Sequence, residues 1–91
     1  MGDEIGFAVT KARIYVTYKP TVLDPQGNAI QTALHHLGFA DVESVRMGKY
    51  LEVELGTDDT AKAQEKVEAM CQQLLANPVI ESYRFDLETV Q

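Results

Sequence analysis

The sequence predicts an α+β domain with the ferredoxin-like order βαββαβ, in which two helices cover one face of a four-stranded antiparallel sheet. Four short segments alternate apolar with polar residues, as half-buried strands do. Two longer segments repeat apolar residues at the spacing of an amphipathic helix. Because crossovers are right-handed, this order places both helices on the same face of the sheet.

The first strand and the first helix come early in the chain. Residues 12–18 (ARIYVTY) are rich in β-branched and aromatic side chains, and Pro20 ends the strand. Asp24 is the expected N-cap of a helix whose first position is Pro25, and Gly38 is its expected C′ residue. The apolar stripe of this helix, which is predicted to face the sheet, consists of Ala29, Ile30, Ala33, Leu34 and Leu37.

Residues 43–55 (ESVRMGKYLEVEL) are predicted to form a hairpin of two strands. Val45 and Met47 alternate before Gly48-Lys49, and three apolar residues alternate after this dipeptide. A glycine in so short a connection favours a tight turn with a positive φ.

The second helix is predicted over residues 57–76. Thr57 or Asp58 is the expected N-cap, and Asn77-Pro78 ends the helix because proline cannot continue it. The stripe predicted to be buried consists of Ala63, Val67, Met70, Cys71 and Leu74.

The last strand is predicted over residues 79–87, with Tyr83, Phe85 and Leu87 on the face that the helices cover. The opposite face of the sheet stays open in this architecture. Its arginines either pair with carboxylates across the strands or take part in a subunit contact. The residues predicted on the open face are Arg13, Tyr15, Arg46, Glu52, Glu54 and Arg84.

The domain is predicted to cover residues 11–91, after an N-terminal extension at residues 1–10 whose weak alternation leaves an additional edge strand open. Ninety-one residues form one small domain, which needs help to be stable. A single cysteine allows no internal disulfide, so oligomerisation is the expected source of that help.

The charge and hydropathy of the chain exclude several classes of partner. The net charge is −6, which argues against nucleic acid and against an anionic membrane. No apolar run approaches the roughly 20 residues that span a bilayer, and the first residues lack the basic start of a signal peptide. We therefore expect a cytoplasmic protein.

We find no set of residues that would carry catalysis. The adjacent His35 and His36 point about 100° apart on a helix, so they cannot chelate one metal from one face. Cys71 lies among apolar residues rather than in an electropositive setting. Glu52 and Glu54 share a strand face, where solvated or ion-paired carboxylates are expected. We therefore predict a binding or assembly module that holds no metal or cofactor.

Several short strings, taken in order, are similar to the PurS family, the small subunit of phosphoribosylformylglycinamidine synthase. The resemblance covers nearly all of the chain, from about Lys11 to Val90. The departure from the family is the N-terminal extension, since family members usually start close to the first strand. The strings are LDPQG at 23–27, AL at 33–34, LGF at 37–39, VRMGKY at 45–50 and LLANPVIE at 74–81.

The resemblance implies a non-catalytic part of a three-component ligase in purine biosynthesis. In that complex a glutaminase subunit releases ammonia from glutamine, and a large synthetase subunit uses ATP and magnesium to make the amidine. The PurS-like protein, as a homodimer or tetramer, bridges the two and supports ammonia transfer. The chain itself would bind no cofactor.

The residues expected to contact partners are turn and loop residues, because binding residues concentrate in loops. Several of them also shape the backbone, so the side chains of Gln26, Arg46 and Lys49 are the better candidates. The full set is Pro25, Gln26, Gly27, Arg46, Gly48, Lys49, Asn77 and Pro78.

Two other functions on the same fold are weighed against this one. A small-ligand regulatory domain would need a glycine-lined pocket, for which Gly27 is available but a second glycine is not obvious. A hydrolase of the acylphosphatase type would need an arginine in the loop after the first strand, and residues 19–23 (KPTVL) contain none.

Overall fold

The structure is a computed structural model that describes residues 9–90, and residues 1–8 of the extension predicted at residues 1–10 lie outside them. Val9 and Thr10, which the sequence assigned to the extension, belong to the first strand. The elements are β1 (Val9–Tyr18), α1 (Pro25–His36), β2 (Gly48–Leu55), α2 (Thr60–Met70), the π-helix η1 (Cys71–Leu75) and β3 (Glu81–Val90).

Within the described residues, three antiparallel strands form the sheet in the order β2-β1-β3, with β1 in the centre. Ile14 lies opposite Leu51 on one side and Phe85 on the other. Alternate residues of β1 are buried, because successive side chains of a strand point to opposite faces. The buried face therefore has the apolar pattern that the sequence predicts for it.

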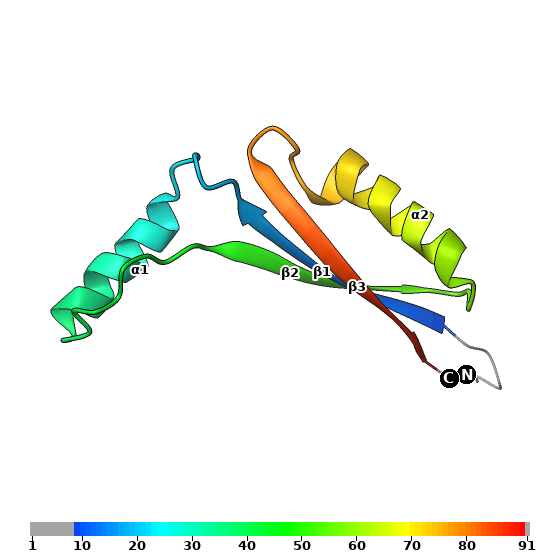
Figure 1. Ribbon diagram of the computed structural model, residues 1–91, viewed down its shortest axis with the longest axis horizontal. Coiled ribbons are helices and arrows are strands. Elements are labelled where there is room, and N and C mark those ends of the chain that lie inside the picture. The colour runs from blue at the N-terminus through cyan, green and yellow to red at the C-terminus, as the bar shows by residue number, and fades with distance from the viewer. Residues whose placement is uncertain (1–8, 91) are drawn as a thin grey trace.

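The core lies between this face and α2, which runs along it over β1 and β3 (Figure 1). Ala63 and Val67 of α2 and Cys71 of η1 are fully buried against the strands. The Tyr83 hydroxyl of β3 donates a hydrogen bond to Glu68, which joins α2 to the sheet and raises the pKa of Tyr83. The predicted burial of Cys71 is confirmed.

The start and the end of α2 differ from the prediction. Asp59, rather than Thr57 or Asp58, is the N-cap, and its side chain accepts a hydrogen bond from the Lys62 backbone N–H at 3.1 Å. The last turn is a π-helix, which ends with a bond from Ala76 N–H to the Cys71 carbonyl. A π-helical turn holds more residues than an α-helical turn, so it rotates the following side chains. Leu74, predicted in the buried stripe, is for this reason 81% exposed.

α1 does not lie on the sheet, contrary to the prediction that both helices cover one face. It projects from the end of the sheet, together with the segment that returns from it (Figure 1). The molecule extends over 52 × 28 × 19 Å with a radius of gyration of 17.6 Å, against about 12 Å for a compact chain of this length. We call α1 and residues 37–47 the arm.

The predicted four-stranded sheet is wrong, because residues 43–47 form no strand. This segment runs back along α1, where the Gln31 side chain donates a hydrogen bond to the Glu43 carbonyl at 3.0 Å. With α1 away from the sheet, the segment has no neighbouring strand to pair with. Gly48 opens β2 instead of a hairpin turn, and among the described glycines it is Gly38 that has a positive φ, 102°, as expected of a C′ residue.

Among residues 9–90, the helices are too short and too polar for any of them to cross a lipid bilayer.

Candidate functional site

The arm is attached to the sheet through the carboxylate of Asp24, which is 2% exposed. One oxygen accepts the backbone N–H of Gly27 at 2.9 Å, as an N-cap does, and the other accepts the backbone N–H of Met47 at 2.7 Å. These hydrogen bonds to the charged form lower the pKa of Asp24. One side chain thus joins the start of α1 to the segment that enters β2.

Arg46 makes a second connection at this place, and we call Asp24, Gly27, Arg46 and Met47 together the joint. Its guanidinium donates hydrogen bonds to the backbone carbonyls of Lys19 at 2.6 Å and Tyr18 at 3.1 Å. A longer contact of 3.4 Å reaches the carbonyl of Val22. The predicted place of Arg46 on the open face of the sheet is therefore wrong, since its donors hold the loop after β1.

Two glycines allow the chain to approach itself at the joint. A Cβ added to Gly27 would lie 2.3 Å from the carbonyl oxygen of Val45. A Cβ added to Gly48 would lie 2.4 Å from the carbonyl oxygen of Val16. Both distances are far below van der Waals contact, so any larger residue would displace the backbone of the arm or of β2.

A cavity of about 280 Å³ opens beside the joint, at the end of the sheet. Lys49 lines it and donates a hydrogen bond to the Leu75 carbonyl at 3.3 Å, while its Nζ lies 4.0 Å from a carboxylate oxygen of Glu81. Glu81 also accepts the backbone N–H of Asn77 at 2.7 Å. The lining residues are Val16, Thr17, Tyr18, Gln26, Met47, Gly48, Lys49 and Glu81.

Aliphatic side chains that are largely open to solvent lie at the same end of the sheet as this cavity. Leu23 is 71% exposed and Val79 is 77% exposed, each on a loop at this end of the sheet. The two loops are joined by a hydrogen bond of 2.9 Å from the Lys19 N–H to the Ile80 carbonyl. Large exposed aliphatic groups that gather around polar ones are typical of protein interfaces. We call the cavity with Leu23, Leu74, Val79 and Ile80 the joint-end surface.

The structure brings the eight predicted contact residues to this end of the molecule. Gln26, Gly48 and Lys49 line the cavity, and Asn77 adjoins it through Glu81. Gly27 and Arg46 build the joint, while Pro25 at the start of α1 and Pro78 in the turn before β3 are exposed. Whether these residues contact a partner stays a prediction.

Sequence reasoning missed the central roles of Asp24 and Glu81. Asp24 was identified only as a helix cap, and no local signal shows that its second oxygen holds Met47. Glu81 is the first residue of β3, a position with no distinctive pattern. The exposure of Leu74 depends on the π-helix, which the helical spacing does not reveal.

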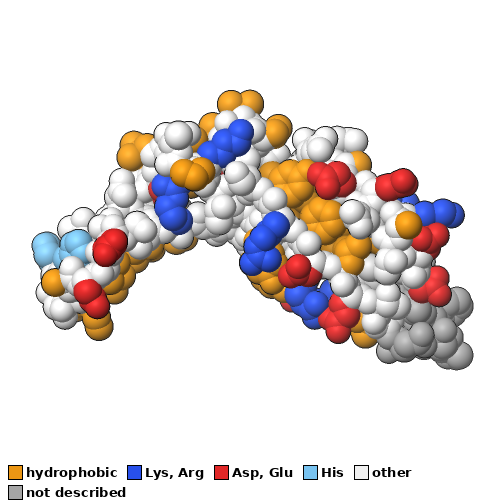
Figure 2. Space-filling model, in the orientation of Figure 1, with side chains coloured by type: hydrophobic (Ala, Val, Ile, Leu, Met, Phe, Trp, Pro, Cys, Tyr) orange, Lys and Arg blue, Asp and Glu red, His pale blue; other side chains and the backbone are white. Residues whose placement is uncertain are grey.

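The arm carries an apolar side that no other part of residues 9–90 covers. Ile30 is 38% exposed, Leu37 is 73% exposed, and Phe39 at the tip is 54% exposed. Figure 2 shows hydrophobic side chains along the lower edge of the arm. The helix is predicted correctly, but its stripe is not buried in the chain.

The sheet has a matching uncovered region. α2 packs on β1 and β3, and the apolar side chains of β2 on the same face are only partly buried. These side chains, Leu51, Val53 and Leu55, lie where α1 would pack in a ferredoxin-like domain.

The sequence model of the PurS family, described as phosphoribosylformylglycinamidine (FGAM) synthase, matches residues 11–89. The chain belongs to the PurS family. A curated relative, the phosphoribosylformylglycinamidine synthase subunit PurS of Bacillus subtilis, is 46% identical over 80 residues, which are 88% of this chain and 94% of the relative. The PurS subunit of Synechocystis is 49% identical over 79 residues, 87% of this chain and 79% of the relative. The resemblance drawn from the sequence is confirmed.

Solved PurS structures share the fold. The B. subtilis PurS structure superposes with a TM-score of 0.78 at 46% identity, covering 87% of this chain and 98% of that one. A chain in the structure of PurLQS from Thermotoga maritima gives a TM-score of 0.80 at 34% identity, covering 88% of this chain and 98% of that one. The protein is thus a subunit of phosphoribosylformylglycinamidine synthase, a ligase of purine biosynthesis.

Proposed function

We propose that this PurS-family subunit acts as a dimer that holds the glutaminase and synthetase subunits of the complex together and supports ammonia transfer between them. The observation that carries the proposal is an arm with an uncovered apolar side, attached rigidly beside an exposed joint-end surface. A relative of known structure is part of PurLQS from Thermotoga maritima, which supports a multi-subunit setting.

The dimer is argued from the two uncovered regions. The arm of one copy would lie on the β2 half of the sheet of the other copy, where Leu51 and Val53 are only partly buried. Each sheet would then carry two helices on one face, the ferredoxin-like arrangement, with α1 supplied by the partner copy. Such an exchange of elements is a low-cost route to dimers and stabilises domains too small to bury enough surface alone.

Bridging is argued from the joint-end surface. Exposed aliphatic side chains around a polar cavity give a partner both apolar contact and hydrogen-bonding groups, namely Gln26 and Lys49. A dimer has two copies of this surface, so it can hold more than one large subunit.

The chemical need for such a subunit follows from the properties of ammonia. In water at neutral pH ammonia is mostly ammonium, which is not a nucleophile. Two active sites on different chains must therefore be held in register along a sheltered path, and such proximity lowers the barrier of the second reaction. In this proposal ATP, magnesium and glutamine bind the large subunits in the cytoplasm, and this chain binds no cofactor.

The small-ligand alternative has less support. Its pocket would be lined by glycines, but the carbonyl groups of Val45 and Val16 already occupy the space beside Gly27 and Gly48. A rise in melting temperature with an added amino acid would revive that alternative.

The dimer is tested with a charge on the arm. Ile30→Asp places a carboxylate in the apolar side of α1, whereas Thr32→Asp places it about 200° further round the helix. Light scattering after size exclusion should show a dimer for the wild type and for Thr32→Asp, and a monomer for Ile30→Asp. A dimeric Ile30→Asp protein would contradict the exchange of arms.

Bridging is tested with the two large subunits. Val79→Ser should leave the dimer intact but weaken its entry into the complex, and Ala69→Ser on the exposed side of α2 is the matched control. Glutamine-dependent activity should fall with Val79→Ser, while activity with added ammonia should not. If omission of this subunit left glutamine-dependent activity unchanged, the proposal would be wrong.

A further inference from the structure

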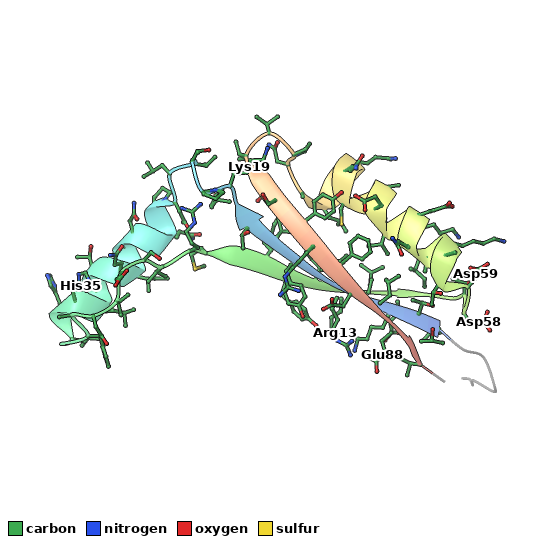
Figure 3. The ribbon with its side chains drawn as sticks, viewed as in Figure 1. Arg13, Lys19, His35, Asp58, Asp59 and Glu88 are labelled. Carbon is green, nitrogen blue, oxygen red and sulfur yellow. The ribbon has the colours of Figure 1, made fainter. Side chains whose placement is uncertain are left out.

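The face of the sheet opposite α2 has two halves of different character. Toward the chain ends, Lys11 and Arg13 of β1 are flanked by carboxylates of β2 and β3. Arg13 contacts Glu88 at 2.6 Å, and Lys11 contacts Glu52 at 3.2 Å. Figure 3 shows Arg13 and Glu88 side by side on the side of the sheet away from α2. The cations of this half are therefore already paired within the chain.

The other half is an aromatic platform with one arginine. Tyr15 lies between Tyr50 and Arg84 on the neighbouring strands. The guanidinium carbon of Arg84 lies 4.0 Å from the centre of the Tyr15 ring, and the rings of Tyr15 and Tyr50 are 5.1 Å apart. Stacking on an aromatic face holds a guanidinium flat and leaves the N–H groups on its edge able to donate.

The platform borders an open depression of about 160 Å³. Thr17 and Ser82, which are opposite each other on β1 and β3, supply hydroxyl groups beside Arg84. Among the described residues, the carboxylate that pairs with Arg84 is that of Asp86, whose Oδ2 lies 3.8 Å from the Arg84 Nη1. This distance is too long for a hydrogen bond, so the pairing within the chain is loose.

The groups at this depression favour one kind of ligand. A guanidinium and two hydroxyls can bind a carboxylate through several hydrogen bonds. A phosphate, with more charge, would be repelled by Asp86 and by Glu52, which is bonded to Tyr50 at 2.7 Å. Tyrosine and arginine together are also the residues that dominate the energy of protein interfaces.

We infer that the platform of Tyr15, Tyr50 and Arg84 is a second protein-docking surface, at which Arg84 binds a carboxylate side chain of one of the large subunits. The inference rests on the proposed function for the identity of the partner. It adds a contact on the open face of the sheet, separate from the joint-end surface, so that two different surfaces of one chain face two different partners.

Affinity is the first measurement. Arg84→Gln removes the guanidinium from an exposed position, and Lys66→Gln on α2 removes the same charge elsewhere. Titration calorimetry with each purified large subunit should show at least about tenfold weaker binding of one of them to Arg84→Gln, as for the loss of one desolvated charge pair. Lys66→Gln should bind as the wild type does, and light scattering should give both variants the wild-type oligomeric state.

Carbodiimide crosslinking identifies the ligand. In Arg84→Lys the introduced amine can attack a carbodiimide-activated carboxylate of the partner, forming an amide and releasing the urea, whereas the wild-type guanidinium cannot be coupled. Mass spectrometry should locate this amide at an Asp or Glu of a large subunit. A link to a second copy of this chain, or no link at this position, would overturn the inference.

The two proposals fail in different ways. If Val79→Ser weakens entry into the complex and Arg84→Gln does not, the carboxylate-binding platform is wrong and the bridging role stands. If neither large subunit binds the wild-type dimer at all, the bridging role is wrong and the platform loses its proposed partner with it. An altered oligomeric state of Arg84→Gln would assign the platform to contacts between copies, and would also overturn the inference.

Discussion

The carboxylate of Asp24 accepts the backbone N–H of Met47 at 2.7 Å, although the two residues lie on opposite sides of the arm in the sequence. The same carboxylate caps α1 through Gly27. The segment that leaves β1 and the segment that returns to β2 are thus joined by hydrogen bonds at the base of the arm. The arm is held as one unit with a fixed direction, which is the preorganisation that the proposed exchange of arms needs.

Stability should depend on pH through Asp24. The pKa of Asp24 is lower in the folded state than in the unfolded chain. Its contribution to folding stability is therefore fully present above the ordinary aspartate pKa of about 4, and it is lost as the pH falls through the lower pKa of the folded state. Asp24→Asn should melt at a lower temperature than the wild type at neutral pH, because an amide cannot accept both backbone N–H groups equally well. The difference in melting temperature should shrink as the pH falls below about 4. A difference that stays constant over this range would show that the charge of Asp24 contributes nothing.

Gly27→Ala should destabilise the protein through a clash. Its Cβ would lie 2.3 Å from the Val45 carbonyl oxygen, and overpacking of this kind costs about 1–3 kcal/mol. Gly56→Ala is the matched control, because a Cβ there meets nothing within 4 Å. Urea unfolding monitored by circular dichroism should separate the two variants. Equal stability would mean that residues 43–47 move away from α1 at little cost.

Two apolar positions in and after α2 should differ in how much stability truncation costs. Val67 is 0% exposed, so Val67→Ala removes methyl groups from the core and should lower the free energy of unfolding by about 2 kcal/mol. Leu74→Ala truncates a side chain that is 81% exposed and should change the stability of the isolated chain by less than about 0.5 kcal/mol. A large loss with Leu74→Ala would mean that the π-helical turn is replaced by a turn that buries Leu74.

The Cys71 thiol should react slowly in the folded protein. Burial raises its pKa, and the charge of Glu68 raises it further, so little nucleophilic thiolate is present. Alkylation by iodoacetamide should be at least about a hundredfold slower in the native than in the unfolded protein, since reaction requires local opening. Mass spectrometry of timed samples measures this ratio. Rapid alkylation of the native protein would show that η1 opens readily.

The strands and helices were largely predictable because their signals are local. The alternation in residues 12–18 and 81–87 and the helical spacing of Val67 and Cys71 each place a side chain on a face within one element. The contacts across the core then follow from those faces, and the structure shows them.

The direction of the arm was not predictable from the same signals. The stripe that contains Ile30 and Leu37 indicates that α1 is covered, but it does not say whether the cover belongs to the same chain. The alternation of Val45 and Met47 likewise suggests a strand, while their actual neighbours are α1 and Asp24. Such positions are decided by contacts between distant residues, which a single sequence does not display.

The register of the sheet places Val9 directly opposite Val90, so the first and last described residues are neighbours, far from the arm (Figure 1). A short peptide could connect these neighbouring strand ends and close the backbone into a ring. New termini could then be opened near Gly56, in the loop between β2 and α2, without cutting the arm or β3. In a circularly permuted chain of this kind, tags and fluorescent labels would be attached to the new termini in that loop, and the ends of β1 and β3 would be joined by the added peptide.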